Sequence, residues 1–260
     1  TEFGTTYNSY VMKAGDKTVL FETAKAKFFD EYLEHLQEVI DIRKIDYLVV
    51  SHTEPDHAGS IKEFSDKYPE AKIVASAKAI AMLPQFFEIA DLADRAVAVK
   101  EGEELSLGSH TLQFFMAPMV HWPEVMVEYE KSEKILFSAD GFGKFGALDA
   151  DEDWTCEARR YYFNIVGKYG AQVQALLKKA ATLDIQTICP LHGPILKENL
   201  GYYIGKYMTW SSYEPEDDGV LVAYASIHGN TKTAAEKMKE ILEAKGAKKV
   251  AITDLSRDDM

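Results

Sequence analysis

One short stretch of the chain holds an unusual density of side chains that bind metal ions. Residues 51–60 read Ser-His-Thr-Glu-Pro-Asp-His-Ala-Gly-Ser, so two histidines and two carboxylates fall within six positions. Imidazole and carboxylate groups together form a donor set for iron, manganese or zinc. A solvated turn seldom collects so many donors, and we therefore predict a metal-binding loop that uses His52, Glu54, Asp56 and His57.

The sequence on either side of this loop indicates how it is held. Residues 46–50 form an apolar, β-branched run that is typical of a buried strand, and residues 58–68 predict a helix. Alternate residues of an extended segment point to the same side, so we expect His52, Glu54 and Asp56 to converge. The proline that follows Glu54 restricts that residue to extended conformations, which supports the same geometry.

Three more candidate ligands come later in the chain. His121, Asp140 and His192 each follow an apolar, strand-like run and lie beside proline or glycine. Taken singly, each is more often structural, as a loop histidine with satisfied hydrogen bonds or as an aspartate before a turn. Because all of them share the context of the first loop, a common site explains them better.

Composition excludes several classes of partner. The 260 residues are 47% hydrophobic, which suffices for one large domain or for one domain and part of another. A net charge of −13 argues against nucleic acid or an anionic membrane as partner, because both require clustered Lys and Arg. No apolar run approaches about 18 residues, so no membrane span is expected. Cys156 and Cys189 form no Cys-x-x-Cys pair, which excludes a rubredoxin-like module here and favours a reducing cytoplasm.

The predicted elements indicate an α/β layered domain with two sheets inside and helices outside. It begins with a strand pair at 7–14 and 18–23 and a helix at 25–40. Further strands are predicted at 72–76, 95–100, 103–107, 110–117, 125–130, 134–138 and 186–189. Further helices are predicted at 77–87, at 156–182 with Gly167 or Gly170 as a candidate break, and at 198–211.

A change in composition divides the chain. Residues 213–218 are acidic and contain proline, so we predict a linker between a first domain, 1–212, and a segment, 219–260. That segment predicts one βαβ unit, with residues 226–231, Ser-Ile-His-Gly-Asn-Thr, between its first strand and its helix. Hydroxyls and N–H groups at a helix N-terminus bind phosphate, although an ordinary capped turn has the same pattern. The candidate phosphate-binding residues are Ser226, His228, Gly229, Asn230 and Thr231.

The combination of these features resembles one protein family. The spacing His-x-Glu-x-Asp-His, followed by His121, Asp140 and His192 at strand ends, is similar to the metallo-β-lactamase superfamily and, more narrowly, to the flavodiiron proteins (A-type flavoproteins). Glu54 is the distinguishing residue, because hydrolases of the superfamily usually carry histidine there and bind zinc. The likeness extends over about residues 5–231 and includes 4–8, 121–123, 191–194 and 211–213.

The resemblance implies a fold and a set of ligands. The fold is a metallo-β-lactamase-like αββα sandwich followed by the first βαβ part of a flavodoxin-like doubly wound domain. One iron would be bound by His52, Glu54, His121 and Asp140, and the other by Asp56, His57, His192 and a bridging Asp140. This set of nitrogen and oxygen donors suits iron or manganese at least as well as zinc, and zinc has no redox chemistry. The loop at 226–231 implies flavin mononucleotide (FMN).

The resemblance also implies an oxidoreductase. FMN would pass electrons to a non-haem diiron site that reduces dioxygen to water or nitric oxide to nitrous oxide. The electron donor would be rubredoxin, a flavoreductase or a reduced deazaflavin, and the protein would form a head-to-tail homodimer or a tetramer. Tyr161 and Tyr162 are candidate proton donors, with helix packing as their commoner role.

Two alternatives stay open. One is a dinuclear zinc hydrolase that cleaves an ester, thioester or lactam, against which Glu54 and the flavodoxin-like segment both argue. The other is a non-catalytic redox or metal-binding fragment. A flavodoxin-like domain needs roughly 140 residues, and 219–260 supplies only its beginning, so we expect a fragment of a longer protein that holds FMN.

Overall fold

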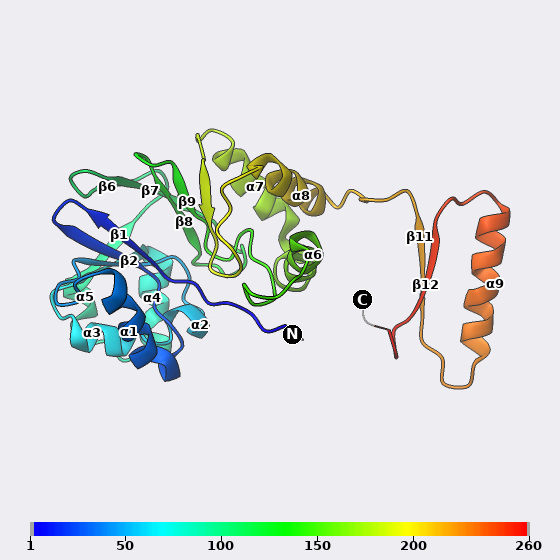
Figure 1. The fold of residues 1–260 in the computed structure, drawn as a ribbon, viewed down its shortest axis with the longest axis horizontal. Coiled ribbons are helices and arrows are strands. Elements are labelled where there is room, and N and C mark those ends of the chain that lie inside the picture. The colour runs from blue at the N-terminus through cyan, green and yellow to red at the C-terminus, as the bar shows by residue number, and fades with distance from the viewer. Residues whose placement is uncertain (1–2, 259–260) are drawn as a thin grey trace. The chain divides into compact units, whose positions relative to one another are not determined.

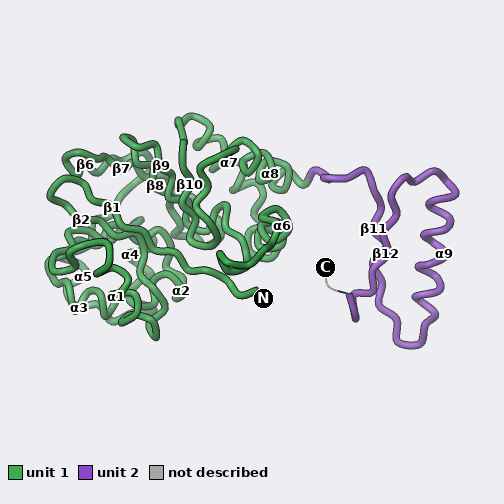
Figure 2. Tube along the Cα trace, viewed as in Figure 1, with its two compact units in different colours: residues 1–213 green, residues 214–260 purple. Residues whose placement is uncertain are grey.

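The structure, a computed structural model, describes residues 3–258. The chain divides into two compact units, residues 1–213 and residues 214–260 (Figure 2). The predicted linker at 213–218 begins at this boundary, and the roles of both segments stay predictions. Within residues 3–258, no helix has the length and apolar character needed to cross a membrane.

The first unit is built on two five-stranded sheets that lie face to face (Figure 1). One has the order β1-β2-β3-β4-β5 and is parallel except for the β1–β2 pair. The other has the order β10-β9-β8-β7-β6 and is antiparallel except for β9–β10. The strands are β1 Tyr10–Ala14, β2 Lys17–Phe21, β3 Tyr47–Val50, β4 Lys72–Ser76, β5 Ala96–Val99, β6 Glu104–Ser106, β7 Thr111–Met116, β8 Met126–Glu130, β9 Ile135–Phe137 and β10 Thr187–Cys189.

Helices cover the outer face of each sheet, which confirms the predicted αββα sandwich (Figure 1). Helices from the first half of the chain pack on the first sheet, and α6 to α8 pack on the second. The helices are α1 Phe29–Val39, α2 Pro55–Ala58, α3 Ile61–Lys67, α4 Ala77–Phe86, α5 Leu92–Arg95, α6 Trp154–Ile165, α7 Gly170–Ala180 and α8 Leu200–Ser212, with short 3-10 helices at Ala26–Phe28 and Gly167–Tyr169.

Strand β3 shows why the sequence before the ligand loop is apolar at every position. Leu48 and Val50 pack into the core beneath the helices, together with Phe64. Val49 points to the opposite face and packs in the core between the two sheets, against residues that include Phe137. Because both faces of the strand are covered, the side chains that point to either face must be apolar. The strand therefore delivers the loop from the middle of the sandwich.

Two local predictions were wrong, and both errors concern the site. The first strand begins at Tyr10 rather than at residue 7, because the preceding segment bonds to the loop near His192, with Asn8 N donating to the Leu191 carbonyl at 2.8 Å. The helix predicted at 58–68 begins only at Ile61, as α3, and a separate helical turn, α2, precedes it at Pro55–Ala58. A Cβ atom on Gly59 would lie 2.3 Å from the Pro55 carbonyl, so this break needs glycine.

The second unit is a single βαβ element, as predicted. Strands β11 (Val220–Tyr224) and β12 (Val250–Asp254) are parallel, and α9 (Asn230–Ala244) connects them. Gly229 precedes the helix with φ of 86°, a conformation that side chains with a Cβ rarely adopt.

Candidate metal centre

Four donor side chains converge where three strands end. His52 follows β3, His121 follows β7 and Asp140 follows β9, while Glu54 directly precedes α2. The Nε2 atom of His52 lies 3.1 Å from Glu54 Oε2 and 3.3 Å from His121 Nε2. His121 Nε2 lies 3.0 Å from Asp140 Oδ2. Donors bonded to one ion at about 2 Å are separated by about 3 Å, so this spacing fits a shared cation.

A second group of donors adjoins the first. His57 Nε2 lies 3.4 Å from Asp56 Oδ2, and His192 Nε2, from the loop after β10, lies 3.6 Å from the same oxygen. The other oxygen of Asp140, Oδ1, lies 3.2 Å from His57 Nε2 and 3.7 Å from His192 Nε2. Asp140 therefore faces both groups, one oxygen to each, as a ligand that bridges two ions would.

The expected convergence of His52, Glu54 and Asp56 was wrong for Asp56. The donors fall into two groups, with His52 and Glu54 in one and Asp56 in the other. Pro55 starts α2, and a proline at the first helical position favours a helical turn. Asp56 and His57 thus leave the extended path of the loop. The structure brings all seven predicted ligands together, in the grouping that the family resemblance implied.

Several donor atoms have no hydrogen-bond partner within the described part of the chain, and a pair of bound cations would satisfy them. His57 Nε2 and Asp140 Oδ1 are buried atoms with no hydrogen-bond partner among residues 3–258, and Asp56 Oδ1 is a third. Such atoms are costly to bury unless something else satisfies them. The Nε2 atoms of His52 and His121 lie 3.3 Å apart, a spacing that a cation bound to both would accommodate. The set contains no thiolate, which suits iron.

Hydrogen bonds from outside the ligand set orient two of the histidines. His192 Nδ1 donates to the Thr6 carbonyl at 2.6 Å, so its Nε2 lone pair must face the site. His52 Nδ1 bonds at 2.9 Å to a carboxylate oxygen of Glu124, which also accepts from Thr53 N and Thr53 Oγ1. These partners were not predicted. The sequence shows Glu124 only as an acid two residues after Trp122. Its partner, His52, lies 72 positions away, so the pairing could not be read from local pattern.

Replacing Glu124 with glutamine is expected to lower metal affinity about tenfold, and alanine about 100-fold, because the partner of a ligand histidine sets its orientation and basicity. Competition with a chromophoric chelator measures this affinity. Thr53→Val is the matched control: it removes a hydrogen bond to the same carboxylate oxygen but leaves the contact with His52. Equal losses in Glu124→Ala and Thr53→Val would contradict the orienting role.

Two further carboxyl groups support the ligand loop from behind. Glu22, 1% exposed, accepts hydrogen bonds from the backbone N–H groups of Ser51 and His52. Burial raises the pKa of Glu22 to about 7. Glu128 accepts from the Ser51 hydroxyl, and burial together with nearby Glu22 raises the pKa of Glu128 well above its usual value. Burial therefore favours the neutral form of Glu128 behind the site.

Protons occupy the histidine pair when no metal does. Burial lowers the pKa of His52, but hydrogen bonds to Glu124 and Glu54 outweigh burial and raise that pKa to about 10. Burial opposes the charge on His121 too, yet Asp140 and Glu54 raise its pKa to about 9. For Asp140, burial would raise the pKa, whereas the contacts with His121 and His57 hold it well below its usual value.

The metal-free protein should therefore lose stability as the pH rises from about 6.5 to about 10. Histidine in the unfolded chain has a pKa of about 6.5, so the stabilising protonation of His52 and His121 is complete below that value. It is lost as the pH passes through about 9 and about 10. Urea unfolding of chelator-treated protein at stepped pH measures this. Metal-loaded protein should show a smaller dependence, and a metal-free stability that rises over this interval would contradict the assignment.

The two candidate tyrosines have different surroundings. The ring of Tyr161 lies 5.4 Å from that of His192, and burial together with nearby Asp140 raises the pKa of Tyr161 well above its usual value. Tyr162 packs instead in an aromatic cluster with Tyr207 and Trp210, at ring distances of 5.1 and 5.5 Å. Only Tyr161 adjoins the ligands, so we keep it alone as a candidate proton donor.

The candidate phosphate loop, residues 226–231, lies in the second unit between β11 and α9. Gly229 N donates to Ser226 Oγ at 3.0 Å, which closes the turn before α9. Thr231 lies in the first turn of this 15-residue helix, where backbone N–H groups lack partners within the helix. A Cβ on Gly229 would meet no atom within 4 Å, so the loop is open there. These features fit a phosphate group, and the assignment of Ser226, His228, Gly229, Asn230 and Thr231 stays a prediction.

Comparisons with known proteins agree with this geometry. A sequence profile described as "ODP family beta lactamase" matches residues 5–193. The chain is 35% identical to an uncharacterized protein of Methanocaldococcus jannaschii over 99% of this chain and 67% of that protein. It is 36% identical to diflavin flavoprotein A 1 of Synechocystis (98% and 45%) and 32% identical to the nitric oxide reductase of Moorella thermoacetica (100% and 66%). The chain thus spans between 45% and 67% of these relatives.

Solved structures show the same likeness. The rubredoxin oxygen:oxidoreductase from Desulfovibrio gigas matches with a TM-score of 0.88 at 32% identity, over 98% of this chain and 65% of that one. The flavodiiron protein from Giardia intestinalis matches with a TM-score of 0.90 at 28% identity, over 99% and 64%. The profile covers more than half of the chain, and the structural likeness covers nearly all of it. The chain therefore belongs to the ODP family of β-lactamase-type proteins and, within it, to the flavodiiron proteins.

Proposed function

We propose that this chain is the diiron-binding part of an oxidoreductase that reduces dioxygen to water, nitric oxide to nitrous oxide, or both. The observation that carries the proposal is the pair of donor groups that share Asp140 and contain only nitrogen and oxygen donors. When bound, the two irons would supply redox equivalents and polarise the gas. Glu54, in place of the histidine usual in the zinc hydrolases, favours this chemistry over hydrolysis.

The exposure of the ligands indicates where electrons and gas would reach the site. The side chains of Glu54 and Asp56 are 35% and 19% exposed, whereas those of His52, His57 and Asp140 are at most 3% exposed. The site is therefore most exposed at the edge formed by Glu54 and Asp56. We propose that electrons arrive at this edge.

Both reductions consume protons as well as electrons, and Tyr161 is placed to supply one. Its phenol faces Asp140 and keeps its proton at neutral pH, because its pKa is raised. We expect Tyr161→Phe to lower kcat about tenfold or more, with unchanged metal content. Tyr162→Phe is the matched control, since the Tyr162 hydroxyl is buried with no hydrogen-bond partner among the described residues and its loss should change little. Equal kcat values for the two variants would reject the role of Tyr161.

The proposed reaction also needs FMN and an external electron donor. The nitric oxide reductase and rubredoxin-oxygen oxidoreductase among the relatives carry in their names the two gases and a rubredoxin donor. We propose that the loop at 226–231 binds the phosphate of FMN and that rubredoxin, a flavoreductase or a reduced deazaflavin supplies the electrons. A head-to-tail homodimer, or a tetramer made of two such dimers, would bring the flavin of one chain to the metal site of another.

The test is gas consumption by the intact, iron-loaded protein. Dioxygen and nitric oxide uptake would be measured separately with a chemical reductant, beside elemental analysis of the same sample. Turnover of either gas with two irons per chain is the expected result. Failure with both gases in an iron-replete sample would reject the proposal. Two zinc ions with esterase turnover would favour the hydrolase instead.

A further inference from the structure

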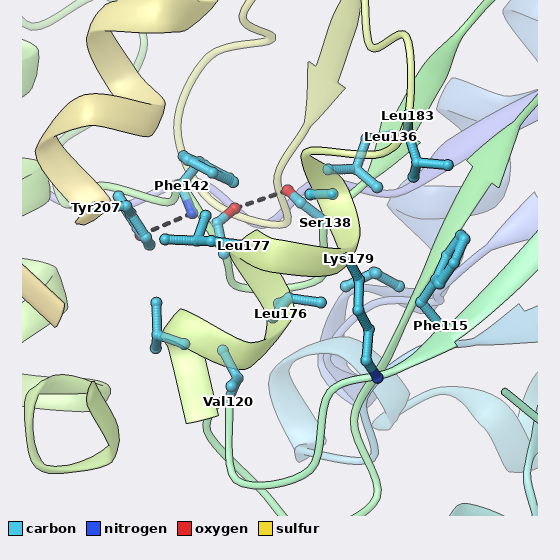
Figure 3. A pocket seen from close by; sticks show the side chains of 14 residues that line it. Phe115, Val120, Leu136, Ser138, Phe142, Leu176, Leu177, Lys179, Leu183 and Tyr207 are labelled. Carbon is cyan, nitrogen blue, oxygen red and sulfur yellow. Dashed lines mark hydrogen bonds between the residues drawn. The ribbon is translucent and has the colours of Figure 1, made fainter. Parts of the chain in front are cut away.

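A largely apolar cavity is lined in part by Ser138, Gly141 and Phe142, which lie near Asp140 in the sequence (Figure 3). Its volume open to the centres of water-sized molecules is about 30 Å³, and about 10–15 Å³ suffices for one such molecule. The lining comes from the second sheet, from α7 and α8, and from the loops beside them. Its apolar side chains include Phe115, Val120, Val127, Leu136, Val173 and Leu177.

The polar groups in the lining are already engaged. Ser138 Oγ donates to the Gly141 carbonyl at 2.7 Å, and Phe142 N donates to the Tyr207 hydroxyl at 2.7 Å, as the dashed lines in Figure 3 show. The amine of Lys179 bonds at 2.8 and 2.9 Å to a carboxylate and a backbone carbonyl that lie outside the lining. A water molecule needs two to four polar partners, so these walls favour an apolar occupant.

The cavity adjoins the backbone of two metal ligands. Val120 directly precedes His121, while Ser138 and Gly141 lie on either side of Asp140 in sequence, and all three line the cavity. The wall of the cavity is therefore formed partly by the same loops that position the metal donors.

We propose that this cavity takes up small apolar gas molecules, the chemical class of dioxygen and nitric oxide, beside the metal centre. Such gases leave water readily for an apolar enclosure, and a dry cavity of aliphatic side chains binds xenon for the same reason. The identity of the natural gas rests on the proposed function. The capacity to hold gas depends only on the walls, and it needs neither metal nor an electron donor.

Xenon titration of the intact protein tests the proposal. Methyl resonances of Val120, Val127 and Leu177 should shift saturably as xenon pressure rises. Val173→Ile adds one methyl group to the lining and should weaken xenon binding about tenfold or more, because an occupied cavity would then be overpacked. Val74→Ile is the matched control: it makes the same change at a fully buried valine between the two sheets, outside the cavity, and should leave xenon binding unchanged.

The absence of saturable shifts in the unaltered protein, or equal xenon binding in Val173→Ile and Val74→Ile, would overturn the proposal whatever the activity. In iron-loaded protein, Val173→Ile should raise KM for the gas severalfold with kcat unchanged, which marks a change in access or binding rather than chemistry. An unchanged KM despite lost xenon binding would overturn the link to the reaction. Xenon binding without any gas consumption would reject the proposed function and leave the cavity site standing.

Discussion

Replacing Asp140 with asparagine should abolish the binuclear site. The bound metal is expected to fall from two ions to one or none per chain, and gas reduction by about 1,000-fold or more, since both ions and the chemistry they supply depend on this ligand. Asp140 is the one donor that faces both groups, with Oδ2 at 3.0 Å from His121 and Oδ1 at 3.2 Å from His57. Asparagine has the same shape but no charge, and its nitrogen offers no lone pair.

Glu128→Gln is the control for this change. Glu128 is fully buried like Asp140, and the substitution again replaces a carboxyl group with an amide. Glu128 lies outside both donor groups, and burial raises its pKa and favours its neutral form, so the amide should keep both metal ions. Elemental analysis and gas-uptake kinetics on the two variants, with circular dichroism to verify folding, measure the contrast. Retention of two ions in Asp140→Asn would show that Asp140 does not bridge.

The seven ligands could be predicted because their positions combine chemistry with local pattern. Each is a histidine or acid at the end of an apolar run, and strand ends of a layered fold meet along common edges. The path of the chain within the loop, and so the position of Asp56, could not be predicted. A helical turn begins at Pro55, because proline favours the first position of a helix, and this turn brings Asp56 to His192. That contact joins residues distant in sequence, which local preference does not reveal.

The supporting groups could not be predicted for the same reason. Thr6 accepts a hydrogen bond from His192 across 186 positions, and Glu124 meets His52 across 72. Glu128 lies in a strand, where an acid at every second position normally indicates a solvated face. Here that strand is buried along its whole length, and Glu128 accepts a hydrogen bond from the Ser51 hydroxyl. Only the three-dimensional arrangement distinguishes a buried, neutral carboxyl from an exposed, charged one.

Glu54→His should convert the metal preference of the site. Two divalent ions bring four positive charges, and the carboxylates of Glu54, Asp56 and Asp140 offset three of them. Histidine at position 54 removes one negative charge and adds a neutral nitrogen donor, which favours zinc over ferrous iron. In reconstitution with equal iron and zinc, we expect the ratio of bound zinc to iron to rise about tenfold or more, and gas reduction to fall about 100-fold or more, because zinc has no redox chemistry.

Glu54→Asp keeps the negative charge of this ligand but shortens its side chain, so it separates the effect of charge from that of length. The Glu54 side chain is 35% exposed at the open edge of the site, so a shorter carboxylate leaves a gap that water can fill without loss of charge. Iron should therefore be retained in Glu54→Asp, with a loss of activity well below that of Glu54→His. If both variants lose iron equally, the length of the side chain rather than its charge selects the metal. If Glu54→His still prefers iron and still reduces gas, the choice between redox and hydrolytic chemistry in this fold does not depend on position 54.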